Sequence, residues 1–266
     1  MPTTGLDGFA RHSHADALQV LGAGLALYVV LAWSLDAPGG WTLRRWIDPA
    51  HEHRAREVAL HASERLLAVR DENERAPAGS IVFLGSSTIE RMPLAELFPA
   101  KPALNRGVER ATLPELERWL DRLLPRATPA AFVVYAGSVD WREDHARPSE
   151  VVERVRSLLD ALARRAPNAP VALLGVLSER GADGELLERL AALDDALAAL
   201  AAARNPPAAF VPTLRPPLTT PTGSSSTGPL AEDVSSDSLH LNRKGYGVLA
   251  RWIVADGGDV GRLLAP

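Results

Sequence analysis

The chain has 266 residues, of which 46% are hydrophobic and 23% are charged, a composition typical of a globular protein. This length suits one α/β domain with an N-terminal extension. The chain contains no cysteine, which excludes disulfide bonds and thiolate metal ligands. Its net charge of -4, with arginines scattered among acidic residues, indicates a solvated surface and no nucleic-acid partner.

An uncharged apolar segment, residues 17–35, follows a short N-terminal tail, residues 1–16. As a helix it would span roughly 28 Å, close to the thickness of the hydrocarbon core of a membrane. Three interpretations remain open: a single transmembrane anchor, a cleaved signal peptide and a buried core helix. The length of the segment and the acids Asp7 and Asp16 disfavour a signal peptide. We therefore expect a single-pass, membrane-anchored protein, and the small bias of flanking basic residues leaves its orientation open.

The rest of the chain divides into two predicted parts. Residues 36–77 are a linker that contains Pro and Gly, followed by a helix rich in Ala, Leu, Glu and Arg over residues 51–77. Residues 78–266 form the folded domain, in which short apolar runs typical of buried strands alternate with helical patterns. The predicted strands are Ser80–Gly85, Ala103–Asn105, Ala131–Ala136, Val171–Val176 and Ala208–Val211. The predicted helices are Leu113–Leu124, Ser149–Arg165 with Ser149 as its N-cap, Gly184–Arg204, and Arg243–Ala255 with Asn242 as its N-cap.

This alternation predicts a three-layer α/β/α sandwich, with a parallel sheet of about five strands between helices. In such folds ligands bind beyond the carboxyl ends of the strands. The predicted strands bring four segments to this edge: Ser87, the Asn105–Thr112 loop, the Gly137–Asp140 loop and the Asp237–His240 loop. A candidate site is therefore expected there.

Two short motifs supply the groups of a hydrolytic triad. Ser87 follows a buried strand and Gly85, so that its hydroxyl is a candidate nucleophile, although such a turn is also a common structural feature. Asp237 and His240 are three residues apart, which lets the carboxylate orient the imidazole ring as a base. The alternative is the start of a helix with a solvated His. No set of His, Asp and Glu has the spacing of metal ligands, so neither a metal nor an organic cofactor is expected.

Four segments between about residues 78 and 257 resemble, in order and spacing, the motifs of the SGNH (GDSL-type) hydrolases. They are Gly85-x-Ser87, Asn105-Arg106-Gly107, Tyr135-Ala136-Gly137-Ser138-Val139-Asp140 and Asp237-x-x-His240-Leu241-Asn242. The resemblance implies a flavodoxin-like fold and an esterase, lipase or acetyl-ester hydrolase. It assigns Ser87 as the nucleophile, His240 as the base and Asp237 as the acid of the triad.

Two positions depart from the pattern of this family, and both concern the oxyanion hole. The third motif usually has an Asn whose side-chain amide donates to the oxyanion, and Val139 has no such donor. The second usually has a Gly whose backbone N–H donates, and a Cβ on Arg110 restricts the geometry that this requires. Only the Ser87 backbone donor is retained without qualification, with the Ser138 hydroxyl or the Arg110 guanidinium as substitutes. The expected substrate-loop residues are Gly107, Gly137, Ser138 and Asp140.

The sequence thus predicts a Ser-His-Asp hydrolase of a small acyl-ester, lipid or glycan substrate, with an atypical oxyanion hole. The alternative is a catalytically weak domain that binds an acylated ligand or a partner protein. Val139 and Arg110 favour this alternative, whereas the retained Ser87, Asp237 and His240 favour the enzyme.

Overall fold

The computed structural model describes residue 28 and residues 49–135, 137–143, 146–222 and 227–266. The chain divides into two compact units, Met1–Ala59 and Leu60–Pro266. The second unit contains the whole sheet and begins inside the segment that the sequence assigns to linker and helix. The expected boundary at residue 78 remains a prediction.

The predicted membrane segment, residues 17–35, lies outside the described residues except for Tyr28. Within the part of the chain that the structure describes, no helix combines the length and apolar character that a membrane span requires. The anchor therefore remains a prediction from the sequence.

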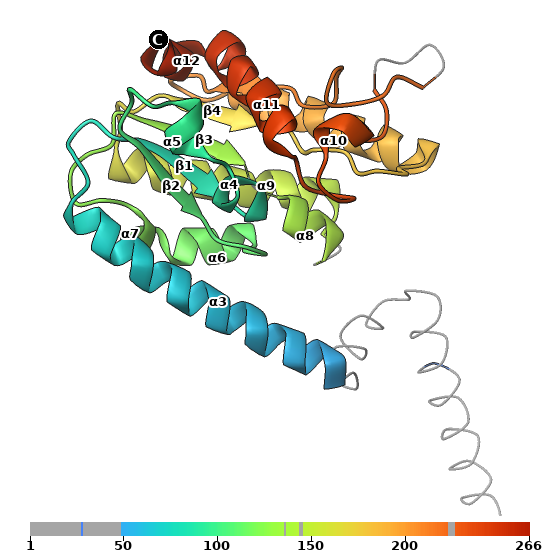
Figure 1. Cartoon of the computed structure of the whole chain (residues 1–266), viewed down its shortest axis with the longest axis horizontal. Helices are drawn as coiled ribbons and strands as arrows, with labels where there is room; N and C mark the ends of the chain where they lie inside the picture. Colours follow the sequence, from blue (N-terminus) through green and yellow to red (C-terminus); the bar gives the residue numbers. More distant parts are fainter. Residues whose placement is uncertain (1–27, 29–48, 136, 144–145, 223–226) are drawn as a thin grey trace, which may run out of the picture. The chain divides into compact units, whose positions relative to one another are not determined.

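A single parallel sheet of five strands lies at the centre of the second unit, in the order β2-β1-β3-β4-β5 (Figure 1). The strands are β1 (Ile81–Gly85), β2 (Ala103–Gly107), β3 (Ala131–Tyr135), β4 (Val171–Leu174) and β5 (Ala209–Val211). This order is that of flavodoxin-like folds. The predicted strands are all present, with ends shifted by one or two residues at several of them, and the predicted three-layer architecture is confirmed.

Helices cover both faces of the sheet. One face packs against the part of α3 (Pro49–Glu74) that belongs to the second unit, and against α6 (Leu113–Arg118), α7 (Leu120–Leu123), α9 (Pro148–Arg165) and α10 (Gly184–Ala202). The other packs against α4 (Ser87–Glu90), α5 (Leu94–Leu97), α11 (Arg243–Asp256) and α12 (Gly258–Leu264). The short helices α8 (Ser138–Arg142) and η1 (Glu232–Val234) lie in the segments that follow β3 and β5.

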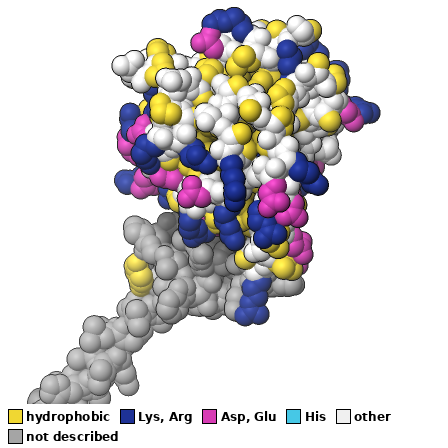
Figure 2. Space-filling model, turned by 90° about the vertical axis from the view of Figure 1, so that its left-hand side faces the viewer, with side chains coloured by type: hydrophobic (Ala, Val, Ile, Leu, Met, Phe, Trp, Pro, Cys, Tyr) yellow, Lys and Arg dark blue, Asp and Glu magenta, His cyan; other side chains and the backbone are white. Residues whose placement is uncertain are grey.

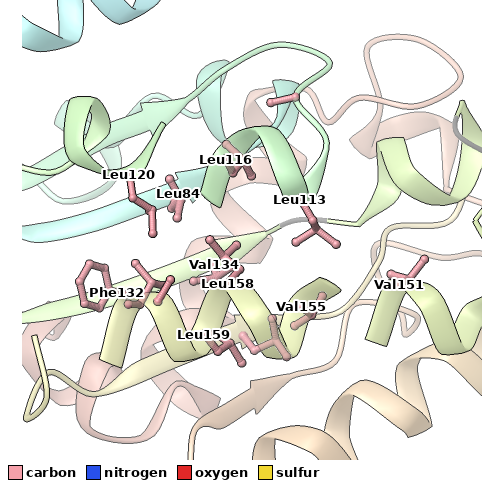
Figure 3. Close-up of a cluster of buried hydrophobic side chains, with 14 of the residues drawn as sticks. Leu84, Leu113, Leu116, Leu120, Phe132, Val134, Val151, Val155, Leu158 and Leu159 are labelled. Atoms are coloured by element: carbon pink, nitrogen blue, oxygen red, sulfur yellow. The ribbon is translucent and has the colours of Figure 1, made fainter. Parts of the chain in front are cut away.

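Two hydrophobic cores follow from the period of two along each strand. In β1, Val82 and Leu84 point to one face, whereas Ile81 and Phe83 point to the other. Figure 3 shows part of the first core, where Leu84 lies among side chains of α6 and α9. Burial of each such side chain stabilises the fold by about 1.5–3 kcal/mol, and both cores therefore stabilise the sheet that positions the loops at its edge.

Two helix predictions need correction and one is confirmed. The predicted helix 113–124 is divided into α6 and α7 at Trp119. Ser149 is not the N-cap of α9, because the helix begins at Pro148, whose missing N–H costs little in the first turn. Asn242 does cap α11, since its side chain accepts the N–H of Gly245.

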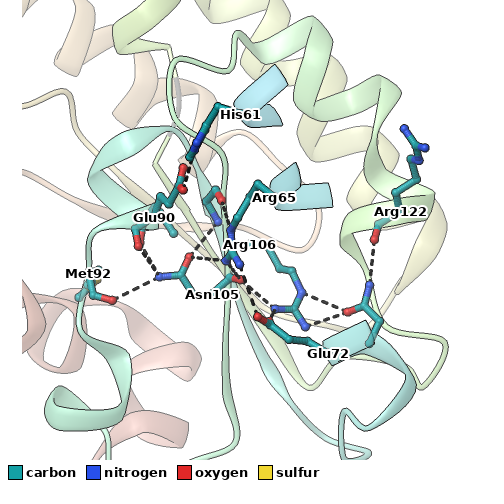
Figure 4. Close-up of polar contacts among 11 residues, drawn as sticks. His61, Arg65, Glu72, Glu90, Met92, Asn105, Arg106 and Arg122 are labelled. Carbon is teal, nitrogen blue, oxygen red and sulfur yellow. Dashed lines mark hydrogen bonds and ion pairs between the residues drawn. The ribbon is translucent and has the colours of Figure 1, made fainter. Parts of the chain in front are cut away.

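Polar contacts from α3 cover the edge strand β2 (Figure 4). The Arg65 guanidinium donates to the carbonyl oxygens of Asn105 and Gly107, at 2.8 and 3.1 Å. The fully buried Arg106 side chain pairs with Glu72 at 2.6 Å, which compensates for its removal from water. These contacts satisfy carbonyl groups of a strand edge that would otherwise need water.

Candidate active site

Ser87 is the first residue of α4, one position after the sharp turn at the end of β1. Gly85 is required in this turn, because a Cβ there would lie 2.0 Å from the carbonyl oxygen of Tyr135. The Tyr246 hydroxyl, buried in α11, donates to the Thr88 carbonyl at 2.9 Å. The turn that presents Ser87 is therefore held from both the sheet and the helix layer.

His240 lies between Ser87 and Asp237. Its Nε2 is 3.0 Å from the Ser87 Oγ, and its Nδ1 is 2.8 Å from Oδ2 of Asp237. A carboxylate only accepts hydrogen bonds, so Nδ1 carries the proton and Nε2 is left to accept the Ser87 hydroxyl. The structure thus brings together Ser87, Asp237 and His240, which the sequence analysis grouped as a candidate triad from opposite ends of the folded domain.

The Asp237 carboxylate is held in its charged form. Desolvation alone would raise its pKa, but hydrogen bonds from the Leu239 N–H, the His240 ring and the His240 N–H outweigh it and lower the pKa of Asp237 to about 2. Both backbone N–H groups donate to Oδ1 at 2.8 Å. Arg91 adds a cation at 3.7 Å from Oδ2. The carboxylate is therefore an oriented, permanently charged partner for the imidazole at neutral pH.

A pocket of about 220 Å³ opens beside this set. Polar and charged side chains form most of its wall, and the lining residues are Ser87, Thr88, Glu109, Arg110, Tyr135, Ser138, Val139, Arg142, Glu143, Leu239 and His240. Two ion pairs border it: the Arg110 guanidinium binds Glu143, and the Arg142 guanidinium lies 3.1 Å from Glu179. The pocket is small and polar.

The two residues that depart from the family pattern both line this pocket. Val139 presents an apolar, largely buried side chain to it. Arg110 has φ of 59°, the one positive φ outside glycine among the described residues. Arg110 therefore adopts, in spite of its Cβ, the left-handed conformation that glycine favours.

The backbone at Arg110 forms a tight turn, in which the Ala111 N–H donates to the Val108 carbonyl at 3.1 Å. A positive φ at the third residue is characteristic of a type II turn. The N–H groups of Ser87 and Arg110 have no hydrogen-bond acceptor within the described part of the chain. Two backbone donors without an acceptor among the described residues therefore belong to residues that line the pocket beside the Ser87 Oγ.

The other predicted loop residues divide into two groups. Ser138 lines the pocket, as Val139 does. Gly107 instead packs against α4, where a Cβ would lie 2.1 Å from the Glu90 nitrogen, and Gly137 precedes α8 with φ of 100°. The fully buried Asp140 carboxylate accepts the Leu113 N–H at 2.9 Å and pairs with Arg154. Gly107, Gly137 and Asp140 thus shape the loops without lining the pocket.

Sequence reasoning missed several residues that line the pocket. Arg142 and Glu143 belong to a charged stretch that reads as surface, and Glu109 and Leu239 carry no motif of their own. Glu109 and Leu239 lie inside the Asn105–Thr112 and Asp237–His240 segments, and Arg142 and Glu143 come shortly after the Gly137–Asp140 loop. Their place near a predicted edge segment is the one signal that pointed to them. On the face drawn in Figure 2, basic and acidic side chains are interspersed, in keeping with such ion pairs.

A cluster of potential metal ligands emerges only in three dimensions. His61, Glu90 and Glu109 come from three segments, and their ligand atoms lie within 4.8 Å of one another. Hydrogen bonds account for this arrangement. One Glu90 oxygen is 2.8 Å from His61 Nε2, the other accepts the Glu109 N–H, and the Glu109 carboxylate pairs with Arg91 at 3.0 Å.

The fold is that of a flavodoxin-like α/β domain with a small polar pocket beside Ser87, and comparison with known proteins specifies the family. The profile of the GDSL-like Lipase/Acylhydrolase family matches residues 89–248, well over half of the chain. The chain belongs to this family of ester hydrolases, as its motifs predict.

Solved structures share the fold. A protein provisionally described as a platelet activating factor from Streptococcus pneumonia is 23% identical, with a TM-score of 0.66 over 77% of this chain and 96% of its own. A protein provisionally described as an acylhydrolase from Bacteroides fragilis is 20% identical, with a TM-score of 0.57 over 74% and 95%. A GDSL-like lipase from Bacteroides thetaiotaomicron is 20% identical, with a TM-score of 0.56 over 75% and 98%. A search of curated proteins found no match.

Proposed function

We propose that the protein is a serine ester hydrolase in which Ser87 is the nucleophile, His240 the general base and Asp237 the residue that orients the imidazole. The observation that carries the proposal is the continuous hydrogen-bonded chain from the Ser87 Oγ through both ring nitrogens of His240 to Asp237. Membership of a family of lipases and acylhydrolases supports the same reaction class.

The reaction would proceed in two half-reactions. The Ser87 Oγ attacks the acyl carbon as its proton passes to His240 Nε2, and the charged Asp237 stabilises the imidazolium that forms. The protonated Nε2 then donates to the leaving alcohol, which departs and leaves an acyl group on Ser87. In the second half-reaction His240 takes a proton from water, whose oxygen attacks the acyl carbon of the acyl-enzyme. The bond from this carbon to the Ser87 Oγ then breaks, the protonated Nε2 returns its proton to the Ser87 Oγ, and the acid is released.

The oxyanion of each tetrahedral intermediate requires donors on the opposite side from the base. The backbone N–H groups of Ser87 and Arg110 are the candidates, because both are free among the described residues and both residues line the pocket. Val139 supplies no side-chain donor. We therefore propose an oxyanion hole built from backbone donors. It lacks the side-chain amide donor of the usual family pattern and should stabilise the oxyanion less.

The pocket supports a short acyl group on a polar alcohol. Pockets for drug-sized ligands measure about 300–1,000 Å³, whereas this one measures about 220 Å³. Its wall includes Arg110, Arg142 and Glu143, which favour hydroxyl or other polar groups over a long hydrocarbon chain. An acetyl ester of a glycan or of another polar alcohol fits these properties better than a long-chain lipid ester.

The proposal is tested by Ser87→Ala with p-nitrophenyl esters of increasing chain length. We expect wild-type hydrolysis to be fastest for acetate, and the variant to be inactive yet folded, because only the nucleophile is lost. A fluorophosphonate probe should label wild-type protein and not the variant. If neither protein hydrolyses these esters and Ser87 is not labelled, the domain is instead a binding module for an acylated ligand or partner.

A further inference from the structure

The candidate oxyanion donor at Arg110 has a backbone conformation that an L-residue does not prefer. Left-handed geometry is disfavoured for such residues by about 5- to 30-fold in population. The turn Val108–Ala111, here called the oxyanion turn, has Arg110 at the position where type II turns usually have glycine. Relaxation to a type I turn would rotate the central Glu109–Arg110 peptide and redirect the Arg110 N–H. The peptide before it, Val108–Glu109, fixes one end of this rotation.

Two contacts near the oxyanion turn leave its central part unrestrained. The Val108 N–H donates to the Gly85 carbonyl at 2.9 Å, which fixes the start of the turn against β1. The Arg110 guanidinium binds Glu143, but it does so through a long, flexible side chain that leaves the backbone free to rotate. Neither contact restrains the Val108–Glu109 peptide, which directly precedes the central Glu109–Arg110 peptide.

Glu90 supplies that restraint. One of its carboxylate oxygens accepts the N–H of Glu109, the residue directly before Arg110. The other lies 2.8 Å from Nε2 of His61 on α3 (Figure 4). The Glu90 side chain is only 18% exposed. Because both oxygens are engaged, the carboxylate has a fixed orientation. Glu90 also ends the short helix α4 that begins at Ser87, so the nucleophile and the restraint share one element.

We propose that Glu90 is a positioning residue, which holds the Val108–Glu109 peptide, and with it one end of the central peptide, so that the Arg110 N–H stays directed at the oxyanion. The inference rests on the proposed function, because the orientation of this N–H affects a rate only if an oxyanion forms at Ser87. His61 acts one step further out, since it fixes the second oxygen of the Glu90 carboxylate. Glu90 itself touches no reacting atom.

The first test measures kcat and KM for p-nitrophenyl acetate in Glu90→Ala and Glu90→Gln. In Glu90→Ala we expect kcat to fall by about 5- to 30-fold, the population lost when the turn relaxes, with KM changed less because the donor acts mainly in the transition state. Glu90→Gln should retain more of kcat, since its amide oxygen still accepts the Glu109 N–H. The matched control is Glu96→Ala, which removes a surface partner of Arg243 and should leave kcat unchanged.

The second test asks whether glycine at position 110 makes Glu90 dispensable. Glycine populates positive and negative φ about equally, so the turn needs no restraint to keep its geometry for a large share of the time. We therefore expect Glu90→Ala to lower kcat by no more than about threefold in an Arg110→Gly background. A residue that only stabilises the fold would cost the same in both backgrounds.

Three results would overturn the inference: wild-type kcat in Glu90→Ala, equal losses in Glu90→Ala and Glu90→Gln, or equal losses with and without Arg110→Gly. Thermal melts identify any variant that fails to fold. If Glu90→Ala alone fails to fold, the comparison of Arg110→Gly with and without Glu90→Ala tests the inference. Loss of the proposed function is recognised separately, because wild-type protein would then show no hydrolysis that depends on Ser87.

Discussion

Replacement of Asp237 by Asn distinguishes a catalytic carboxylate from a merely structural one, because most of its contacts survive the change. Oδ1 accepts the backbone N–H groups of Leu239 and His240, and an amide oxygen does the same. The amide NH₂ then replaces Oδ2, which lies 2.8 Å from His240 Nδ1. A donor thus faces a donor, and the ring changes to the tautomer whose Nε2 carries the proton and cannot accept one from Ser87.

The expected effects on rate and stability differ in size. An Asp→Asn change in Ser-His-Asp hydrolases lowers kcat by about 10⁴, which corresponds to about 5.5 kcal/mol. The pKa of Asp237 is lowered from 3.8 to about 2, a shift worth about 2.5 kcal/mol at face value. The side chain is 49% exposed, so solvent screening reduces its contribution to stability to about 1 kcal/mol or less.

The assay combines kcat for p-nitrophenyl acetate with urea unfolding. The lowered pKa means that the carboxylate stabilises the fold above pH 3.8 and that this contribution disappears as the pH falls towards 2. Wild type and variant should therefore converge in stability in acid. Asp233→Asn is a matched control, since it removes an exposed partner of Lys244 upstream in the same region. A loss in kcat below about tenfold, or a loss explained by unfolding, would refute the reasoning, because tenfold is only about 1.4 kcal/mol.

The remaining predictions concern the oxyanion hole, a buried acid and the N-terminus. Val139→Asn should raise kcat, by up to about 10²-fold if the new amide is well held, with little change in KM; a fall would mean that another group already occupies its place. Burial raises the pKa of Asp194 to about 7, although N–H groups of Val176 and Thr213 oppose the shift. The wild type should therefore lose up to about 4 kcal/mol of stability between pH 4 and 7, and Asp194→Asn should remove this slope in urea unfolding. Removal of residues 1–40 should release a soluble, folded protein from membranes, whereas aggregation or a lost cooperative melt would assign residues 17–35 to the core.

Local patterns explain why the fold was predictable. Short apolar runs alternate with helical segments along the whole domain, and a parallel sheet buries both faces of each strand, so that β1 and β3 read as continuous hydrophobic segments. The cap at Asn242 was predictable for the same reason, because its partner Gly245 is three residues away. The Ser87 turn and the Asp237-x-x-His240 motif are equally local, and parallel strand order brings them to one edge.

Features that depend on distant segments were not predictable. The contacts of α3 with β2 join residues about 40 positions apart, through Arg65 and Asn105, and nothing near either residue indicates the other. His61, Glu90 and Glu109 meet in the same way. The error at Ser149 has a different cause, since Pro148 is a suitable first residue of a helix and moves the cap to Arg147.

The two departures from the family pattern differ in their physical consequences. A side-chain donor disappears when its residue is replaced, so Val139 removes whatever an Asn amide would contribute. A backbone donor is present in every residue except proline, so Arg110 retains its N–H and loses only the conformational freedom of glycine. The positive φ of Arg110 indicates that this conformation is reached in the folded chain. What matters at such a position is therefore whether its neighbours can hold the strained geometry, and Glu90, through the Glu109 N–H, is placed to do so.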